Sequence, residues 1–450
     1  MDYNNNDIII ARATPIGRSA LAIIRLSGNN LTQIIQTFFA TKNGLTPNLV
    51  QLKNIKSRSK NIIIDSCMVV YYKNPKSFTG EDMLEIFCHG NDVIVENVIN
   101  EFIEYNVRVA YPGEFSYRAF KNGKIDLMQA ESIAAKINQN SNQYGVALQN
   151  LEQGVTSQKM QDLRNGILNL YSIIEHELDF NEEEITHLQK KQTVDSIKKL
   201  TLEVEQILNW SLKLQKIEKG YKVMLLGVPN AGKSTLFNRL LGKERAIVTD
   251  IKGTTRDVLE SSLDIHGVPF VFYDTAGFRK STDKIETLGI NKTKQLAQNA
   301  DFIVILDEDN PVLQYNKLIK ESKFLKDKEV IFVKTKCDYG SNNKKEFIEI
   351  SCLNDLGIDT LLTTLLTKVD LNTDRESASN LALCNMRQIN LLKQVNVVFK
   401  GVLNSLNKNI EMDIVASQLR EAIDVFEELL GKMTSNEILN NIFKGFCVGK

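Results

Sequence analysis

The chain has 450 residues, 43% of them hydrophobic, which is enough for about two or three domains with separate cores. Its 55 lysines and arginines balance its 55 aspartates and glutamates, which argues against a protein that coats nucleic acid, so any RNA contact is expected to be local. Six scattered cysteines, four histidines and no long apolar run exclude a readable zinc site, a disulfide framework and a membrane span, so we expect a cytoplasmic protein with no membrane partner.

The first part of the chain, residues 1–118, alternates short β-branched runs with helical stretches and is punctuated by glycine and proline. This texture predicts an N-terminal α/β domain with several short strands. Its polar clusters contain Arg25, Glu81, Asp82, Glu85, Arg118 and Lys124. On residue types alone, these side chains suit either a ligand with amide or carboxylate groups or, more commonly, a solvated surface.

Two stretches, residues 119–216 and 372–450, have apolar residues at a spacing of three to four, which predicts long amphipathic helices. Residues 217–371 between them carry the pattern of a nucleotide-binding unit. Because an amphipathic helix needs a partner for its apolar stripe, we expect one helical domain in two halves with the unit inserted. Two separate helical bundles are the alternative.

The segment GVPNAGKS, residues 227–234, follows an apolar run and leads into a helical pattern. In that context G-x-x-x-x-G-K-S predicts a phosphate-binding loop, and a chance glycine turn is the weaker interpretation. The glycines let successive N–H groups and the helix N-terminus point at a polyphosphate. Lys233 adds a point charge, and Ser234 adds a hydroxyl for Mg²⁺.

Further segments follow in the order that a GTPase requires. Thr254 and Thr255 lie in a glycine-flanked loop that can complete the Mg²⁺ shell, and Asp274 ends an apolar strand before Gly277, whose N–H can reach a γ-phosphate. In TKCD, Asp338 can accept hydrogen bonds from the N1–H and 2-amino group of guanine, a pattern that adenine does not offer.

These boxes resemble those of the translation-factor-like GTPases, which implies an inserted P-loop GTPase domain with a mostly parallel doubly wound sheet. ATP in place of GTP is the alternative. Two residues depart from the pattern: Thr335 stands where Asn is usual, and Cys352 follows Ser351 where Ala is usual. The expected GTP-binding residues are Asn230, Ala231, Gly232, Lys233, Ser234, Thr235, Thr249, Asp250, Ile251, Lys252, Gly253, Thr254, Thr255, Asp274, Thr275, Ala276, Gly277, Thr335, Lys336, Asp338, Ser351 and Cys352.

GTP hydrolysis requires another catalytic group, because Phe278 follows DTAG in place of the glutamine that positions water in Ras-like enzymes. Asn230 and the oxygens of IVTDIKGTT suggest a monovalent cation near the phosphates, so we expect turnover to depend on K⁺. The alternative is that Asn230 only stabilises the turn.

The chain ends in GFCVGK, and its N-terminal part contains TPIGRSALAIIRLSG, SFTGEDMLEIFCHG and PGEFSYRAFKNGKIDLMQAE. With these motifs and the GTPase unit, the sequence resembles the tRNA modification GTPase MnmE (TrmE) family over the whole chain. The resemblance implies a homodimer joined through N-terminal domains that bind a reduced folate such as 5-formyltetrahydrofolate. It also implies joint action with the FAD-dependent protein MnmG (GidA) on the wobble uridine of certain tRNAs, which receives a carboxymethylaminomethyl-type group at C5.

The resemblance also assigns residues. It implies folate contacts at Arg25, Glu85, Lys124 and Lys450, potassium ligands at Asn230, Thr249, Ile251 and Thr254, and magnesium ligands at Ser234 and Thr255. Glu286 corresponds to the acid that positions water, and Cys447 is either a nucleophile or a small buried apolar residue. His89 is expected to be structural. A regulatory GTPase switch in RNA or ribosome assembly, or a scaffold whose partner makes all the bonds, is the alternative function.

Overall fold

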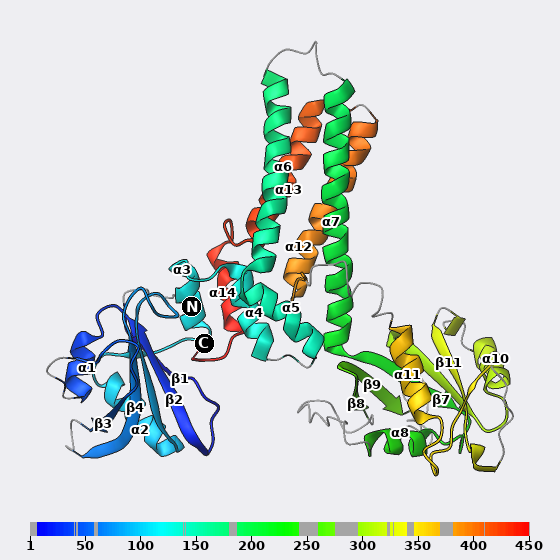
Figure 1. The fold of residues 1–450 in the computed structure, drawn as a ribbon, viewed down its shortest axis with the longest axis horizontal. Helices are drawn as coiled ribbons and strands as arrows, with labels where there is room; N and C mark the ends of the chain where they lie inside the picture. The colour runs from blue at the N-terminus through cyan, green and yellow to red at the C-terminus, as the bar shows by residue number, and fades with distance from the viewer. Residues whose placement is uncertain are drawn as a thin grey trace, which may run out of the picture. The chain divides into compact units, whose positions relative to one another are not determined.

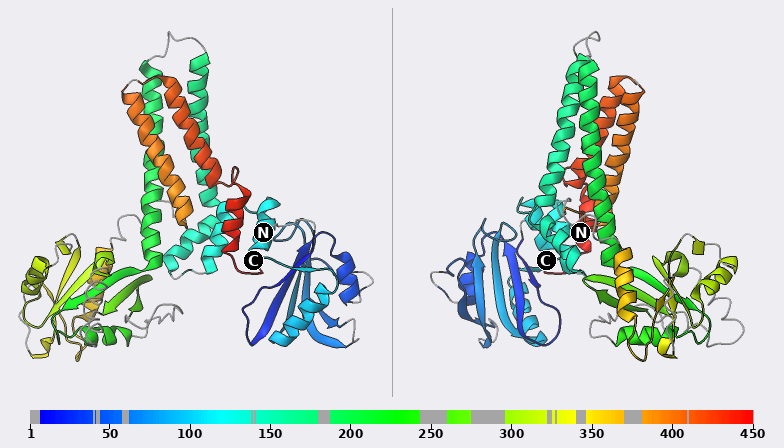
Figure 2. Two further views of the ribbon diagram at one scale, coloured as in Figure 1. Left: turned by 180° about the vertical axis from the view of Figure 1, so that it is seen from behind. Right: turned by 45° about the vertical axis from the view of Figure 1, so that its right-hand side comes forward.

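The chain divides into two compact units, each described here by itself (Figures 1 and 2). The first contains Met1–Asn138, Leu148–Leu208 and Leu383–Lys450, and the second contains Gln139–Ala147 and Asn209–Ala382. The computed structural model describes residues 7–39, 41, 44–57, 62–137, 139, 141–179, 187–242, 260–274, 296–321, 325–326, 328–339, 346–369, 381–408 and 410–449.

The N-terminal part of the first unit is built on a sheet whose described strands follow the order β3-β4-β5-β2-β1-β6. Neighbouring strands are antiparallel except β1 and β6, which are parallel. The strands are β1 (Ile9–Arg12), β2 (Ser19–Gly28), β3 (Gln51–Lys56), β4 (Ile63–Tyr72), β5 (Asp82–Gly90) and β6 (Arg108–Val109).

The two faces of this sheet differ, because successive side chains of a strand point to opposite sides. One face packs with the helices α1 (Thr32–Phe39) and α2 (Asp92–Ile103) into a core that includes Ile24 and Ile86. The other face carries the paired residues Arg25 and Glu85 and, further along β2, the exposed Leu21. The predicted N-terminal α/β domain is therefore confirmed.

Three helices, α3 (Glu114–Lys121), α4 (Leu127–Ile137) and α14 (Asn436–Lys444), follow the sheet and share a small core. Phe443 of α14 packs against Tyr117 of α3 with ring centroids 5.4 Å apart. The last helix of the chain thereby packs against the helix that directly follows the N-terminal sheet.

The long helices of the bundle come from both sides of the second unit in sequence and lie side by side in Figures 1 and 2. They are α6 (Val155–Asp179), α7 (His187–Lys219), α12 (Met386–Asn407) and α13 (Met412–Leu429), and the short helix α5 (Asn142–Glu152) precedes α6 in the chain. Lys400 of α12 pairs with Glu205 of α7 at 2.7 Å, and Lys432, just past α13, donates to Gln161 of α6 at 3.1 Å. The prediction of one helical domain in two halves is confirmed.

The second unit contains a mixed sheet whose described strands follow the order β12-β11-β10-β7-β9-β8. Every neighbouring pair is parallel except β8 with β9. The strands are β7 (Tyr221–Gly227), β8 (Glu260–Ile265), β9 (Val268–Asp274), β10 (Phe302–Asp307), β11 (Glu329–Lys334) and β12 (Ile348–Glu349), and the helices are α8 (Lys233–Leu241), α10 (Pro311–Glu321), η3 (Cys337–Tyr339) and α11 (Ile358–Lys368). The predicted mostly parallel doubly wound sheet is confirmed. None of the described helices is both long and apolar enough to span a membrane.

Candidate functional site

The phosphate-binding loop connects β7 to α8. Gly232, directly before the helix, has a φ of +83°, a left-handed conformation that glycine adopts without steric cost. The Nζ of Lys233 donates to the carbonyl oxygens of Gly227 at 3.0 Å and Val228 at 2.7 Å, and the residue is only 8% exposed. Two carbonyls of the loop therefore fix a positive charge inside it, at the N-terminus of a helix, where anions bind well.

The strand register brings the predicted nucleotide residues to one edge of the sheet. Gly227, the last residue of β7, pairs with Leu306 of β10, and Asp274, the last residue of β9, pairs with Leu225 of β7. Thr335 follows β11, the other neighbour of β10. Because the carboxyl ends of parallel strands share an edge, the loop, Asp274 and the TKCD segment gather where doubly wound sheets bind their ligands.

Thr335, which departs from the usual asparagine, lies behind the phosphate-binding loop. It is 3% exposed, its N–H donates to the carbonyl of Asp307 at 2.9 Å, and a methyl group placed on Gly232 would lie 3.7 Å from its Cβ. Its hydroxyl is buried without a hydrogen-bond partner among the described residues. Thr335 therefore leaves room for no more than a small side chain at Gly232.

The segment expected to read the base is organised around Asp338, in the short helix η3. The hydroxyl of the fully buried Ser351 donates to Oδ1 of Asp338, and the N–H of Asn354 donates to that hydroxyl at 3.1 Å. Burial, and then the charge of Asp338, raise the pKa of the Cys352 thiol. The carboxylate is thus oriented by a neutral donor and keeps capacity to accept further hydrogen bonds.

A second site, in the first unit, forms around Arg25 and Glu85 on neighbouring strands. The Nε of Arg25 donates to Glu85 Oε1 at 2.7 Å, and its Nη1 donates to the carbonyl of Gly449 at 3.3 Å. Burial, followed by the nearby charge of Glu85, raises the pKa of Tyr72, whose hydroxyl lies 3.4 Å from Glu85 Oε2. The contact with Gly449 attaches the C-terminal segment to the open face of the sheet.

The C-terminal segment makes further contacts of its own. The N–H of Gly113 donates to the carbonyl of Cys447 at 3.3 Å. Gly449 has a φ of +88°, and a side chain there would meet the carbonyl oxygen of Arg12 at 2.4 Å, so glycine is required for this approach. Lys124, also expected to contact folate, donates to the carbonyl of Pro75 at 3.1 Å.

Cys447 is the one exposed cysteine of the six, all of which lie in the described part of the chain. By contrast, burial raises the pKa of Cys67 to about 12 and of Cys88 to about 11. Because reactive thiols are accessible and form thiolates readily, Cys447 has the accessibility that thiol chemistry requires, while these buried cysteines are inert.

Comparisons with known proteins agree over nearly the whole chain. Residues 8–124 match the model of the GTP-binding protein TrmE N-terminus, and residues 127–447 match that of the MnmE helical domain. The tRNA modification GTPase MnmE of Aquifex aeolicus is 37% identical, over 98% of this chain and 99% of its own length. The chain belongs to the MnmE family of tRNA modification GTPases. The MnmE of Fervidobacterium nodosum is 35% identical over 100% of this chain and 99% of its own.

Solved structures similar to this MnmE-family chain cover part of it. The G domain of the T. maritima iron transporter FeoB is 22% identical and covers 33% of this chain and 98% of its own, with a TM-score of 0.26. An Era variant from Aquifex aeolicus bound to GDP and aluminium fluoride is 24% identical and covers 40% of this chain and 66% of its own, with a TM-score of 0.26.

Several of the site residues expected from the sequence of this MnmE-family chain lie outside the described residues. They are Thr249, Asp250, Ile251, Lys252, Gly253, Thr254, Thr255, Thr275, Ala276, Gly277, Glu286 and Lys450. The described part of the nucleotide site therefore consists of Asn230–Thr235, the end of β9, Thr335–Asp338 and Ser351–Cys352. Within it, the hydroxyl of Ser234 is a hard oxygen donor of the kind that Mg²⁺ prefers, so its chemistry fits that ion.

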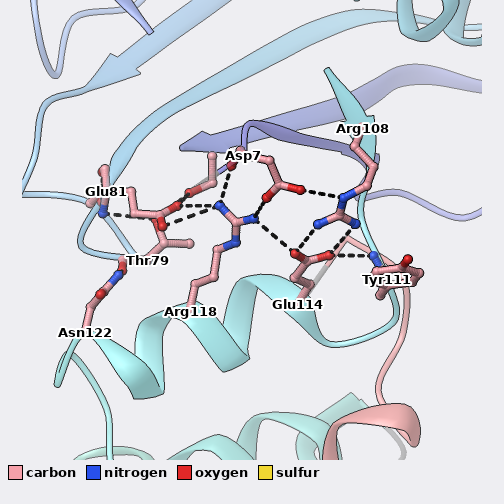
Figure 3. Close-up of polar contacts among 10 residues, drawn as sticks. Asp7, Thr79, Glu81, Arg108, Tyr111, Glu114, Arg118 and Asn122 are labelled. Carbon is pink, nitrogen blue, oxygen red and sulfur yellow. Dashed lines mark hydrogen bonds and ion pairs between the residues drawn. The ribbon is translucent and has the colours of Figure 1, made fainter. Parts of the chain in front are cut away.

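The expectation that the acidic and basic residues near positions 81 and 118 face a ligand or solvent is wrong. Arg118 is 1% exposed, Glu81 5% and Asp82 8%. Figure 3 shows why: Arg118 donates to Glu81 Oε2 at 3.1 Å, to Asp7 Oδ1 at 2.6 Å and to Glu114 Oε1 at 3.1 Å. The cluster fixes α3 to the sheet, and only Arg25, Glu85 and Lys124 of the original polar set stay accessible in part.

Two charged residues that pair with expected ones were not identified from the sequence of this MnmE-family chain. Glu308 forms an ion pair with Lys336, and its position directly after β10, next to the TKCD strand, was the available signal. Asp65 accepts from the N–H of His89 at 2.8 Å and lies 2.8 Å from its ring Nδ1, a pairing of neighbouring strands that the sequence does not show. The hydrogen bonds suit the structural role expected for His89.

Proposed function

We propose that the protein is a GTPase that acts in tRNA modification. The observation that carries the proposal is the pairing of a lysine-bearing phosphate loop with a serine-oriented Asp338 in a chain that matches curated tRNA modification GTPases along its length. We also propose the division into an N-terminal domain (1–118), a helical domain (119–216 and 372–450) and a GTPase domain (217–371).

The reaction we propose is the addition of a carboxymethylaminomethyl-type group at C5 of the wobble uridine, in the cytoplasm, together with the FAD-dependent protein MnmG. A bound 5-formyltetrahydrofolate would supply the one-carbon unit, and Arg25 and Glu85 offer a guanidinium and a carboxylate that suit its amide and ring nitrogens. The test is mass spectrometry of wobble nucleosides after deletion of the gene. Loss of the modification supports the proposal, and an unchanged profile favours a regulatory GTPase switch.

A homodimer joined through the N-terminal domains is part of the proposal. The open face of the sheet supports it, because Leu21 is 46% exposed and Met68 40% exposed beside the pair of Arg25 and Glu85. Apolar side chains rimmed by polar ones are typical of protein interfaces. A second copy seated there would cover these side chains and enclose the folate.

Potassium is expected to accelerate GTP hydrolysis. We propose that Asn230, Thr249, Ile251 and Thr254 hold K⁺, while Ser234 and Thr255 hold Mg²⁺. The support is Asn230, which is exposed in the loop with a φ of +65°. A cation beside the phosphates would offset the charge that develops during hydrolysis. Turnover measured in KCl should exceed that in NaCl of the same ionic strength by about tenfold or more, and equal rates would refute the potassium site.

Glu286 is proposed to position the attacking water. Changing Glu286→Ala should leave GTP affinity within about twofold and slow single-turnover hydrolysis by about a hundredfold or more, since a positioned base contributes about 10²–10⁴ in rate. Glu308→Ala is the control, because its carboxylate pairs with Lys336 rather than with reacting atoms. Normal hydrolysis by the Glu286 variant would reject the assignment.

Cys447 is proposed to take part in the modification chemistry as a nucleophile. Changing Cys447→Ser should abolish wobble modification in cells that carry only this variant, because a serine hydroxyl is a much weaker nucleophile than a thiolate. GTP turnover should stay normal. The matched control is Cys67→Ser, whose thiol is buried and has a pKa raised to about 12. Normal wobble nucleosides in the Cys447 variant would show that the residue is structural.

A further inference from the structure

Two turns of the first unit meet beside the N-terminal sheet. The first, residues 73–80, makes up all but the last residue of the connection from β4 to β5, and the second, residues 122–124, follows α3, which ends at Lys121. The Nζ of Lys124 donates to the carbonyl of Pro75 at 3.1 Å, and the side-chain amide of Asn122 donates to the carbonyl of Thr79 at 2.7 Å (Figure 3 shows the second contact). These bonds hold the two turns together as one surface.

This surface concentrates positive charge. Lys73 and Lys76 of the first turn, Lys121 at the end of α3 and Lys124 of the second turn are all exposed, and neither turn contains an aspartate or glutamate. The carboxylates that follow the first turn do not neutralise it, because Glu81 and Asp82 are buried. Glu81 pairs with Arg118, and Asp82 accepts hydrogen bonds from backbone N–H groups.

An exposed aromatic side chain lies in the same turn as two of these lysines. Phe78 is 38% exposed, although the residues on either side of it are anchored: the Ser77 hydroxyl donates to the carbonyl of Glu81, and the fully buried Thr79 lies 2.7 Å from Ser27 Oγ. The loop therefore holds an aromatic side chain at the surface rather than in the core. We name Lys73, Lys76, Phe78 and Lys121 the lysine–phenylalanine patch.

We propose that the lysine–phenylalanine patch binds single-stranded RNA, with Phe78 stacking on an unpaired base and the lysines contacting phosphates. Aromatic stacking beside a basic groove is how proteins hold unpaired nucleotides, and single-stranded loops are the part of a folded RNA whose bases can be reached. The proposal rests on the tRNA substrate proposed above and assigns the patch to the loop that carries the wobble uridine. A chain with no net charge has to bind RNA locally, and here its lysines are gathered where the neighbouring carboxylates of Glu81 and Asp82 are buried.

The test measures binding of the full-length protein to a fluorescently labelled hairpin RNA with a single-stranded loop, and to the same stem closed as a duplex. The double variant Lys73→Glu and Lys76→Glu should bind both RNAs about tenfold or more weakly and lower the salt dependence by about two phosphate contacts. Phe78→Ala should weaken hairpin binding by about tenfold, leave duplex binding unchanged and leave the salt dependence unchanged, and Phe78→Tyr should restore hairpin binding. Lys124 is kept, because the family resemblance implies that it contacts folate.

The matched control is Lys198→Glu with Lys199→Glu, two exposed lysines of α7 whose replacement changes the net charge by the same amount. It should bind the hairpin like the unaltered protein. Equal GTP turnover and melting temperature show that each variant is folded. The proposal is overturned if the patch variants keep full hairpin affinity or if the control loses as much. The wobble-nucleoside measurement judges the proposed function separately, since modification can depend on the gene even when this patch does not bind RNA.

Discussion

Replacing Arg118 with methionine is expected to destabilise the first unit by about 3–5 kcal/mol, the usual cost of removing one partner from a buried ion pair. Arg118 pairs with Asp7, Glu81 and Glu114, and the side chains of Arg118 and Glu114 are 1% and 0% exposed (Figure 3). Without the guanidinium, carboxylates stay buried with too few donors. A loss of this size is a large part of the about 5–15 kcal/mol that stabilises a typical domain.

Calorimetric unfolding of the Arg118→Met variant measures this loss. Adding nucleotide identifies the transition of the second unit, because a ligand raises the melting temperature of the unit that binds it. The control is Arg239→Met, which removes a pair with Asp355 whose side chains are 44% and 47% exposed and should cost less than about 1 kcal/mol. Similar losses in the two variants would show that the buried cluster adds nothing beyond a surface pair.

The same cluster predicts a pH dependence. Burial alone would raise the pKa of Asp7, but hydrogen bonds from Arg108 and Arg118 outweigh it and hold the pKa below its ordinary value of 3.8. A depressed carboxyl pKa contributes stability that is present above the unfolded value and is lost as the pH falls through the folded value. The unaltered protein should therefore lose this contribution below about pH 4, and the Arg118 variant should lose less over that range.

Changing Asp338→Asn is expected to weaken GTP binding by about 10²–10⁴-fold and to make xanthosine triphosphate the better ligand. The carboxylate accepts from the N1–H and the 2-amino group of guanine, whereas an amide presents one acceptor and one donor, and hydrogen bonds to charged groups are worth about 1.5–3 kcal/mol each. Xanthine has an oxygen in place of the 2-amino group, so it suits the amide. The bond from Ser351 can persist, because the amide oxygen still accepts it.

Calorimetric titration with both nucleotides tests the change in preference. Cys352→Ala is the control, because it restores the residue usual at this position next to Ser351 and should bind GTP within a few-fold of the unaltered protein. If the Asp338 variant binds GTP as tightly as before, Asp338 does not contact the base and the guanine assignment fails.

The architecture can be predicted from the sequence where a local motif or a periodic apolar stripe fixes it. The phosphate loop requires a strand before it and a helix after it, and the amphipathic stretches on both sides of the GTPase unit need each other to bury their apolar stripes. Both expectations are confirmed. The burial of Arg118 could not be predicted, because its partners Asp7, Glu81 and Glu114 come from three separate segments, and charged residues are usually exposed.

In the candidate sites, too, locally encoded features could be predicted and contacts between distant segments could not. The loop residues and Asp338 are ordered by local sequence, so their positions at the edge of the sheet could be predicted. The position of Thr335 behind Gly232, the pair of Lys336 with Glu308 and the approach of Gly449 to Arg12 depend on how distant segments lie together, which no local pattern encodes. The residue roles in both sites stay predictions until the variants above are measured.

The contact between Arg25 and Gly449 joins residues 424 positions apart, and this has a consequence for biogenesis. Domains fold from the N-terminus while the ribosome synthesises the chain. The N-terminal sheet can therefore form early, but the apolar face of α3 and α4 that receives Phe443 stays uncovered until α14 emerges. A premature stop anywhere in the GTPase unit or the bundle would leave that face exposed to chaperones and proteases. The site around Arg25 and Glu85 also needs Gly449, so it is assembled only after all three domains have been translated.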